Sequence, residues 1–257
     1  MRKSLATLAT ISTLAALPWL GLAADEALPK GEAVLDHFVE ATGGKAAYEK
    51  VRSEVSTGSF ELTGKGIRGT VSSSKAAPNK LYLAIDLAGI GKIEDGSNGE
   101  IAWNRSALQG PRLKEGDEKA AALREATFDA PIHWRKLYKS VETVGIENVD
   151  DKSCYKVVLT PLEGKPATHF YDRQSHLLMK VAMTLSSPNG EVAVESKLSD
   201  YRKDGDILTP HRLENSFLGQ QFVITIDTLK WNEEIPKSRF DVPADVQALL
   251  PKAAATK

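Results

Sequence analysis

The sequence predicts a mainly β protein of the α+β class, in which about eleven strands form one antiparallel sheet. Its clearest strand is Leu177–Ser186, where apolar side chains occupy the odd positions while Lys180, Thr184 and Ser186 occupy even ones. This alternation is typical of a strand with one buried and one solvated face. Short turn-forming runs such as Ser187–Gly190 separate the apolar stretches, so consecutive strands are expected to pair as a meander.

Composition indicates a globular protein. The 257 residues are 42% hydrophobic and 26% charged, with a formal net charge of −1, which is an ordinary profile for one domain of this size. The balanced charge, without a block of like charges, predicts no nucleic-acid partner. Cys154 is the single cysteine, so no intramolecular disulfide can form, and we expect it to be a small buried strand residue.

The first residues have the pattern of a secretory signal peptide, predicted at 1–23. Arg2 and Lys3 precede an apolar run that ends in small residues, and cleavage is expected after Ala23 or Ala24. A retained transmembrane helix is the alternative, but Pro18 and several hydroxyl side chains interrupt the run. We therefore expect a soluble periplasmic protein, without stable membrane insertion.

The rest of the chain is predicted to be a single domain, 24–250, with a frayed tail at 251–257. It opens with a helix from Gly31, because Val34, Leu35, Phe38 and Val39 recur at helical spacing. Gly43-Gly44 is expected to stop or kink this helix, and Ala46–Val51 to add a further turn or two.

The predicted strands lie on both sides of a helical midpoint. They are expected at 56–63, 67–74, 81–87, 90–94 and 100–104, and again from 140 to Trp231. Between these sets, the acidic start at Glu115 precedes a helix carrying Leu123. Pro131 begins a second helix, expected to carry Trp134, Leu137, Tyr138 and Val141.

A sheet of this size is expected to curl. Sheets of more than about ten strands seldom remain open and flat, and a curled sheet with helices over its mouth encloses an apolar hollow. The stripes expected to line the hollow are Leu81, Leu83 and Ile85 on one strand, and Leu177, Met179, Val181 and Met183 on another. The alternative is an ordinary core, in which these stripes pack against the helices.

Motifs for catalysis are missing from the sequence. The histidines are His37, His133, His169, His176 and His211, and none has a zinc-binding spacing such as His-Glu-x-x-His. The Gly-x-Ser-x-Gly motif of α/β-hydrolases is absent. The sequence therefore predicts no enzyme, no cofactor and no metal site.

Several segments resemble one family. Asp95-Gly96, with Gly99–Trp103 and the later Pro111, is similar to the turn and tryptophan strand of the LolA/LolB lipoprotein-carrier superfamily, and Ile235–Val246 is similar to its closing segment. The order of signal peptide, helix, strands, two helices and strand meander is also similar to that of this superfamily. Ala41–Gly44 and Gly89–Gly96 resemble exported bacterial proteins described as outer-membrane lipoprotein-sorting proteins.

The resemblance implies a strongly curved incomplete barrel, with the N-terminal helix and the two mid-chain helices as a lid. It implies a carrier that binds a lipid or an acylated protein in an apolar cavity, with an envelope protein as a possible further partner and a monomeric state. Under this interpretation Trp103 also lines the hollow, and Val34, Phe38 and Trp134 belong to the lid.

Two other functions remain open at this point. The same fold serves in periplasmic modules that sense lipid or bind a regulatory partner without transporting anything. The third interpretation is an enzyme acting on lipids, with His169, His176 or His211 as the base.

Overall fold

The computed structural model describes residues 27–187 and 190–251. The predicted signal peptide lies outside these ranges, as does the predicted tail beyond residue 251. The described chain forms one antiparallel sheet of thirteen strands, in the order β6-β5-β4-β3-β2-β1-β13-β12-β11-β10-β9-β8-β7. The predicted fold class is therefore confirmed, with a slightly larger strand count.

The strands are β1 (Ser53–Leu62), β2 (Ile67–Ala76), β3 (Lys80–Leu87), β4 (Gly91–Ser97), β5 (Ala102–Ser106), β6 (Gly110–Leu113), β7 (Tyr138–Val149), β8 (Lys152–Pro161), β9 (Ala167–Asp172), β10 (Leu178–Ser187), β11 (Gly190–Asp204), β12 (Ile207–Phe217) and β13 (Gln220–Trp231). The helices are α1 (Gly31–Ala41), α2 (Lys45–Tyr48), α3 (Gly116–Glu125), η1 (Ala130–His133), α4 (Trp134–Leu137), η2 (Lys237–Phe240) and α5 (Ala244–Gln247). The β6 strand has no counterpart in the sequence prediction.

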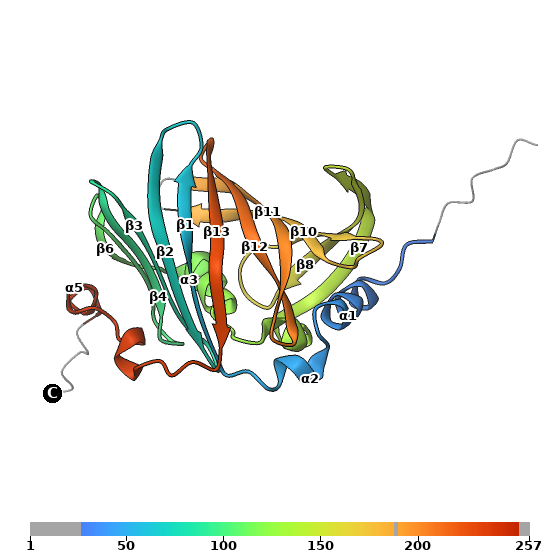
Figure 1. Cartoon of the computed structure of the whole chain (residues 1–257), viewed down its shortest axis with the longest axis horizontal. Helices are drawn as coiled ribbons and strands as arrows, with labels where there is room; N and C mark the ends of the chain where they lie inside the picture. The colour runs from blue at the N-terminus through green and yellow to red at the C-terminus, as the bar shows by residue number, and fades with distance from the viewer. Residues whose placement is uncertain (1–26, 188–189, 252–257) are drawn as a thin grey trace, which may run out of the picture.

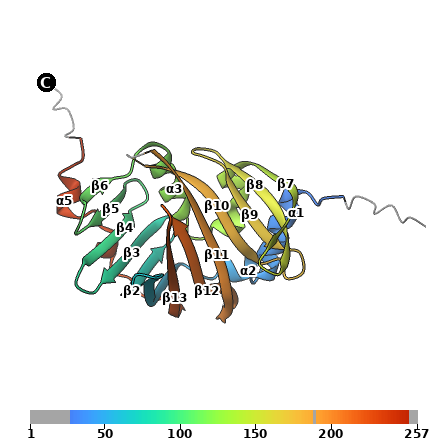
Figure 2. The same ribbon diagram turned by 90° about the horizontal axis from the view of Figure 1, so that it is seen from above.

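The sheet is strongly curved and does not close. Figure 2 shows β3–β6 and β8–β10 as two walls with α3 lying between them. The walls are joined through β2, β1, β13, β12 and β11. α3 contacts β5 on one wall and β10 on the other. The strands β6 and β7 end the sheet and do not pair with each other, so α3 spans the open side of an incomplete barrel.

The predicted break after the first helix is confirmed. Gly43 and Gly44 have φ values of 132° and 74°, in the region that favours glycine. A side chain at Gly43 would also lie 2.5 Å from the carbonyl oxygen of Asp206. The chain therefore turns sharply between α1 and α2 (Figure 1).

The second mid-chain helix is shorter than predicted. It is a 3₁₀ turn followed by the four residues of α4, and Tyr138 already begins β7. Val141, which the helix pattern and the strand expected from 140 both include, is a buried residue of β7. The reason is tertiary: Tyr138 pairs with Pro161 across the β7–β8 ladder, and this ladder takes over where the helix pattern of the sequence would continue.

The helices cover the concave face unevenly. At the β7–β9 end, α1 and α4 pack on the sheet and complete a core. Its buried members are Val34, Leu35, Trp134, Val141, Val157, Leu159 and Tyr171. None of the helices in the described ranges has the length and apolarity needed to cross a bilayer.

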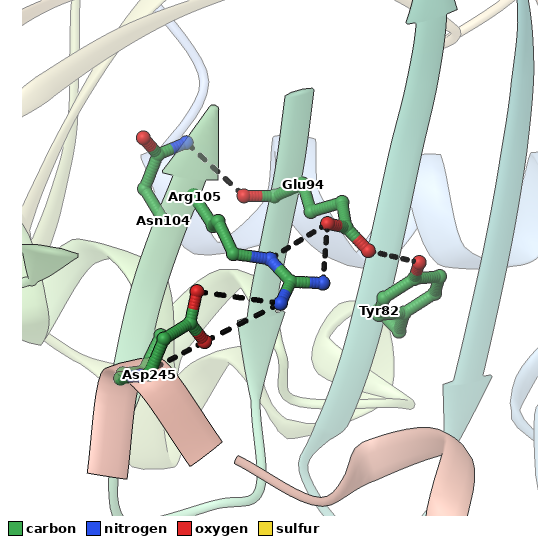
Figure 3. Close-up of polar contacts among 6 residues, drawn as sticks. Tyr82, Glu94, Asn104, Arg105 and Asp245 are labelled. Atoms are coloured by element: carbon green, nitrogen blue, oxygen red, sulfur yellow. Dashed lines mark hydrogen bonds and ion pairs between the residues drawn. The ribbon is translucent and has the colours of Figure 1, made fainter. Parts of the chain in front are cut away.

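The convex face is covered at its other end by the C-terminal segment. Trp103, 1% exposed, packs there with Val242 and Val246. Figure 3 shows the polar contacts beside this cluster, in which Arg105 bridges two carboxylates. Its Nε donates to Glu94 Oε2 over 2.8 Å, and its Nη1 donates to Asp245 Oδ1 on α5 over 3.3 Å.

Glu94 is the most buried member of this network. It is 8% exposed and also accepts a hydrogen bond of 2.7 Å from the Tyr82 hydroxyl. A buried carboxylate is stable only when its charge is paired and its oxygens are hydrogen-bonded. Arg105 and Tyr82 satisfy these needs, and through Arg105 the same network attaches α5 to the sheet.

Truncating Trp103 should therefore destabilise the protein. We expect Trp103→Ala to lower the free energy of unfolding by about 3–5 kcal/mol, because the cavity it leaves under the C-terminal segment cannot fully collapse. Leu162→Ala, at a side chain that is 64% exposed, should change it by no more than about 0.5 kcal/mol. Urea denaturation measures both. A loss below about 1 kcal/mol for Trp103→Ala would contradict this packing.

Candidate functional site

The concave face of the sheet carries an apolar surface on the side away from α1. Its members all lie on strands: Phe60, Leu62, Ile67, Val71, Leu83, Ile85, Leu87, Ile93, Phe222 and Ile224. A hollow of about 470 Å³ opens beside this surface. We call it the front hollow. Its apolar lining is Leu87, Ile90, Ile93, Leu108, Phe217 and Phe222.

The front hollow also has a polar wall. Asp95, Asn104 and Arg112 lie opposite one another on β4, β5 and β6, so their side chains share one face. The Asn104 amide donates to Asp95 Oδ2 over 3.0 Å, and Lys114 forms an ion pair with the same carboxylate. Arg112 binds Glu118 of α3 through two hydrogen bonds, of 2.6 and 2.8 Å.

A second hollow, of about 200 Å³, lies under α1 and α4. We call it the rear hollow. Leu35 and Phe38 of α1 line it together with Trp134, and Tyr171 and Leu178 form part of its floor. A smaller space of about 70 Å³, the middle hollow, separates α3 from β9 and β10, and Met183 lines it.

The helices over the rear hollow are fixed by one polar cluster. Arg135 donates to both oxygens of Asp36 on α1, over 3.0 and 2.7 Å, and Trp134 Nε1 donates to the same carboxylate over 3.2 Å. The hydrogen bonds from Arg135 hold the pKa of Asp36 below its ordinary value. These contacts are half exposed to solvent, so their contribution to stability is small.

α3 is attached to the sheet and to a loop at its two ends and carries small side chains at its centre. Glu118 attaches its first turn to β6 through Arg112, and Arg124 donates from its last turn to the carbonyl oxygen of Glu163 over 3.0 Å. Its central side chains are the alanines at 120–122. A helix of this kind bridges the two walls without filling the space between them.

His169 lies where the rear and middle hollows meet, and it lines both. Burial, together with the charge of Arg124, lowers the pKa of His169 to about 4. Its Nδ1 is 3.0 Å from the Tyr171 hydroxyl, and burial raises the pKa of that tyrosine. The pair is therefore uncharged at neutral pH, as an apolar lining requires.

The structure divides the predicted lining of Leu177–Met183 between two faces. The register between β9 and β10 shifts between Leu178 and Lys180, so Met179 is an extra residue in the ladder. Met179 packs on the convex side against Val149, Cys154 and Phe170. The expected alternation therefore holds for Val181 and Met183, beyond the bulge, but not for Met179. Leu177 precedes β10 in the turn.

The other predicted site residues are also divided. Leu83 and Ile85 belong to the apolar concave surface, and Leu81 is buried at the start of the same strand. Trp103 lies on the opposite, convex face, because it pairs with Gly96 while its neighbour Asn104 pairs with Asp95. Of the predicted lid residues, Phe38 and Trp134 line the rear hollow, and Val34 is a core residue beside it.

Sequence reasoning missed the polar wall altogether. Asn104 follows Trp103 on the five residues of β5. Arg112 precedes Leu113 on β6, a four-residue strand that was not predicted. A signal was nevertheless present, because charged side chains occur at alternate positions, 112 and 114, within that short segment. Only the pairing of β4, β5 and β6 shows that these charges lie beside Asp95.

The three histidines considered as bases lie apart. His176 contacts His37, with the ring centroids 4.9 Å apart and the ring planes tilted by 45°. His211 is 2% exposed, and both its ring nitrogens face protein oxygens: Asp204 Oδ2 at 2.7 Å and the Ile226 carbonyl at 2.8 Å. Neither nitrogen of His211 is left to accept a proton from a substrate. Within 27–187 and 190–251, no three His, Cys, Asp or Glu side chains form a metal-binding group.

Comparisons with known proteins identify the fold. Neither a family model nor a curated protein matches the sequence. Among solved structures, a LolA superfamily protein from Nitrosomonas europaea matches with a TM-score of 0.54 and 13% identity, over 84% of this chain and 99% of that one. A putative outer membrane lipoprotein-sorting protein domain from Vibrio parahaemolyticus matches with a TM-score of 0.54 and 12% identity, over 82% and 97%.

A third solved structure, a DUF1329 family protein from Desulfovibrio piger, matches with a TM-score of 0.52 and 17% identity, over 83% of this chain and 98% of that one. The matches span nearly the whole length of these proteins. The fold is therefore LolA-like, as the sequence resemblance implied.

The neutral state of His169 makes stability depend on pH. Its pKa is lower in the folded chain than the value of 6.5 expected when unfolded, so the unfolded chain binds more protons as the pH falls from 6.5 towards 4. The free energy of unfolding is therefore unaffected by His169 at pH 7 and falls by roughly 3 kcal/mol as the pH drops from 6.5 to 4. We expect His169→Gln to remove this part of the pH dependence.

Urea denaturation at pH 7, 5.5 and 4.5 tests this prediction. His133→Gln, at a more exposed histidine beside Asp129, is the matched control for replacing a histidine by glutamine. If wild type and His169→Gln lose stability in parallel, His169 is not a buried neutral group.

Proposed function

We propose that this chain is an exported carrier, which binds a lipid or the acyl chain of a lipoprotein on the concave face of its sheet. The observation that carries the proposal is the front hollow, about 470 Å³ beside an apolar surface that belongs entirely to strands. The solved structures with the same fold include a LolA superfamily protein and a putative lipoprotein-sorting domain.

The energetics of acyl chains explain why such a hollow suits a carrier. Each methylene that leaves a bilayer for water loses about 0.8 kcal/mol of favourable transfer free energy. A carrier must offer an apolar surface that replaces this loss, but the surface must not hold the chain more tightly than the destination membrane does. A hollow beside an unfilled sheet face can satisfy both needs, because its walls need not close around the ligand.

Export and localisation are part of the same proposal. The basic residues Arg2 and Lys3, the apolar run after them and the small residues at 21, 23 and 24 support a signal peptide and a periplasmic site of action. The proposed partners are a lipid or acylated protein and the envelope components that deliver and receive it. No residue is assigned a covalent step, and we propose that the chain is a monomer without enzymatic activity.

A partner-binding module is the second candidate, and the β7 edge favours it. This strand ends the sheet and exposes Val144 and Ile146, by 50% and 41%. An open edge with apolar side chains can pair with an extended segment of another protein. Native mass spectrometry of protein isolated from its own envelope separates the functions: lipid adducts support the carrier, and a co-purifying protein without lipid supports the module.

A charge placed in the front hollow should abolish lipid retention. We expect Ile93→Glu to weaken binding of a fluorescent fatty alcohol at least tenfold, because the new carboxylate would have to be buried against the aliphatic chain. Val144→Glu is the matched control, an apolar strand residue that is already half exposed, and it should bind as the wild type does. Circular dichroism checks that both variants are folded.

The opposite result would exclude the front hollow as the site. If folded Ile93→Glu retains the fatty alcohol, binding must occur elsewhere, and Phe38→Glu in the rear hollow then tests the next site. Loss of binding in both Ile93→Glu and Val144→Glu would point to a general effect on the fold instead.

A further inference from the structure

The polar wall of the front hollow is a row of charges that neutralise one another. The ion pair of Lys114 with Asp95 is mostly enclosed, with the two side chains 18% and 27% exposed. The pair of Arg112 with Glu118 lies beside it, 35% and 21% exposed. The charge of Asp95 also contributes to raising the pKa of Arg112. Two cations therefore face two carboxylates, and Asn104 adds an amide between them.

The remaining charge near the hollow does not change this balance. Lys92 borders the front hollow, but it lies opposite Asp86 across the β3–β4 ladder, next to the concave residue Ile93. Since side chains alternate between faces along a strand, those of Lys92 and Asp86 point to the convex side. The charges of the two ion pairs in the polar wall, Lys114 with Asp95 and Arg112 with Glu118, thus sum to zero.

The wall opposes an apolar surface across a space that fits one small ligand. The volume of about 470 Å³ lies within the range of roughly 300–1,000 Å³ usual for sites that bind a single small molecule. Phe217 and Phe222, from β12 and β13, line the space together with Asp95 and Arg112, from β4 and β6. A ligand that contacts both sides must itself be amphiphilic.

The charge balance decides what kind of headgroup is accommodated. Arg112 and Lys114 keep donors that could bind an anionic headgroup, but Glu118 and Asp95 lie beside them and repel a third negative charge in this partly enclosed site. A cationic headgroup beside Glu118 or Asp95 is in the same way repelled by Arg112 and Lys114. A headgroup with no net charge can donate to the carboxylates and accept from the cations without breaking either ion pair.

We propose that the front hollow binds an amphiphile with an aliphatic chain and a headgroup of zero net charge, either zwitterionic or polar and uncharged. This inference rests on the proposed lipid-binding function and adds the class of ligand to it. Asp95, Arg112, Lys114 and Glu118 determine headgroup specificity, and the strand side chains hold the aliphatic part. The site selects against free fatty acids and anionic phospholipids relative to neutral lipids of equal chain length.

A panel of single-chain amphiphiles tests the inference. Lysophosphatidylethanolamine, a monoacylglycerol, lysophosphatidylglycerol and an alkyltrimethylammonium salt, all of one chain length, compete for the full mature chain against a fluorescent fatty alcohol. Lysophosphatidylethanolamine and the monoacylglycerol are expected to bind about tenfold more tightly than the anionic and the cationic ligand. This is the difference in affinity that one charge-assisted hydrogen bond makes. All competitors are kept below their critical micelle concentrations.

Two variants shift the balance in opposite directions. Asp95→Asn leaves the wall with a net positive charge and should shift the preference towards lysophosphatidylglycerol. Lys114→Gln leaves it negative and should shift the preference towards the alkyltrimethylammonium salt. Glu100→Gln is the control, because Glu100 is exposed in the β4–β5 turn and does not line the front hollow. A purely structural role would weaken all ligands equally.

The outcomes separate this inference from the proposed function. If the wild type binds all four amphiphiles equally, or if neither variant changes the order, the headgroup assignment is overturned while lipid binding stands. If the protein binds neither the fluorescent alcohol nor any amphiphile, the proposed function itself fails. Opposite shifts in Asp95→Asn and Lys114→Gln support the inference.

Discussion

The pairing of β1 with β13 is the contact on which the rest of the structure depends. It joins two meanders, β1–β6 and β7–β13. Residues that pair across this junction are far apart in sequence: Thr57 and Thr228, for example, are separated by 171 positions. The entropy lost in closing so long a loop grows only slowly with its length. Once the meanders are joined, strand twist bends the single sheet until its apolar surfaces face one another. Phe60 and Phe222 then stack across the junction, with ring centroids 5.3 Å apart.

The two faces of this sheet are covered in different ways, and the difference defines the candidate site. On the convex face, the C-terminal segment covers Trp103, and the Arg105 network attaches it. On the concave face, α1 and α4 cover only the β7–β9 end, and α3 spans the middle with alanines. The front hollow remains open because Glu118, the α3 side chain that lines it, is held against β6 by Arg112. Incomplete cover is thus the property of the sheet on which the proposed lipid binding rests.

Parts of this arrangement could be predicted because they depend on local sequence. The break at Gly43-Gly44 follows from backbone conformations that favour glycine. The stripe from Leu83 to Leu87 follows from simple alternation on a regular strand. The faces of Met179 and Trp103 could not be predicted in this way. A β-bulge at Met179 turns its side chain to the other face of the sheet. Trp103 lies beside Asn104 in the chain and opposite Gly96 in the ladder, and neither residue type shows which face is buried.

By itself, the sequence determined the class of fold, the positions of most strands and turns, and the family that the chain resembles, because each of these depends on short-range periodicity and on local motifs. Only the tertiary structure decided which face each stripe occupies, that Asp95, Asn104 and Arg112 form one wall, and that space remains beside the apolar surface. The physical reason is that a hollow belongs to no single element. It is the volume that strands and helices leave between them, and that volume depends on register, bulges and helix placement together.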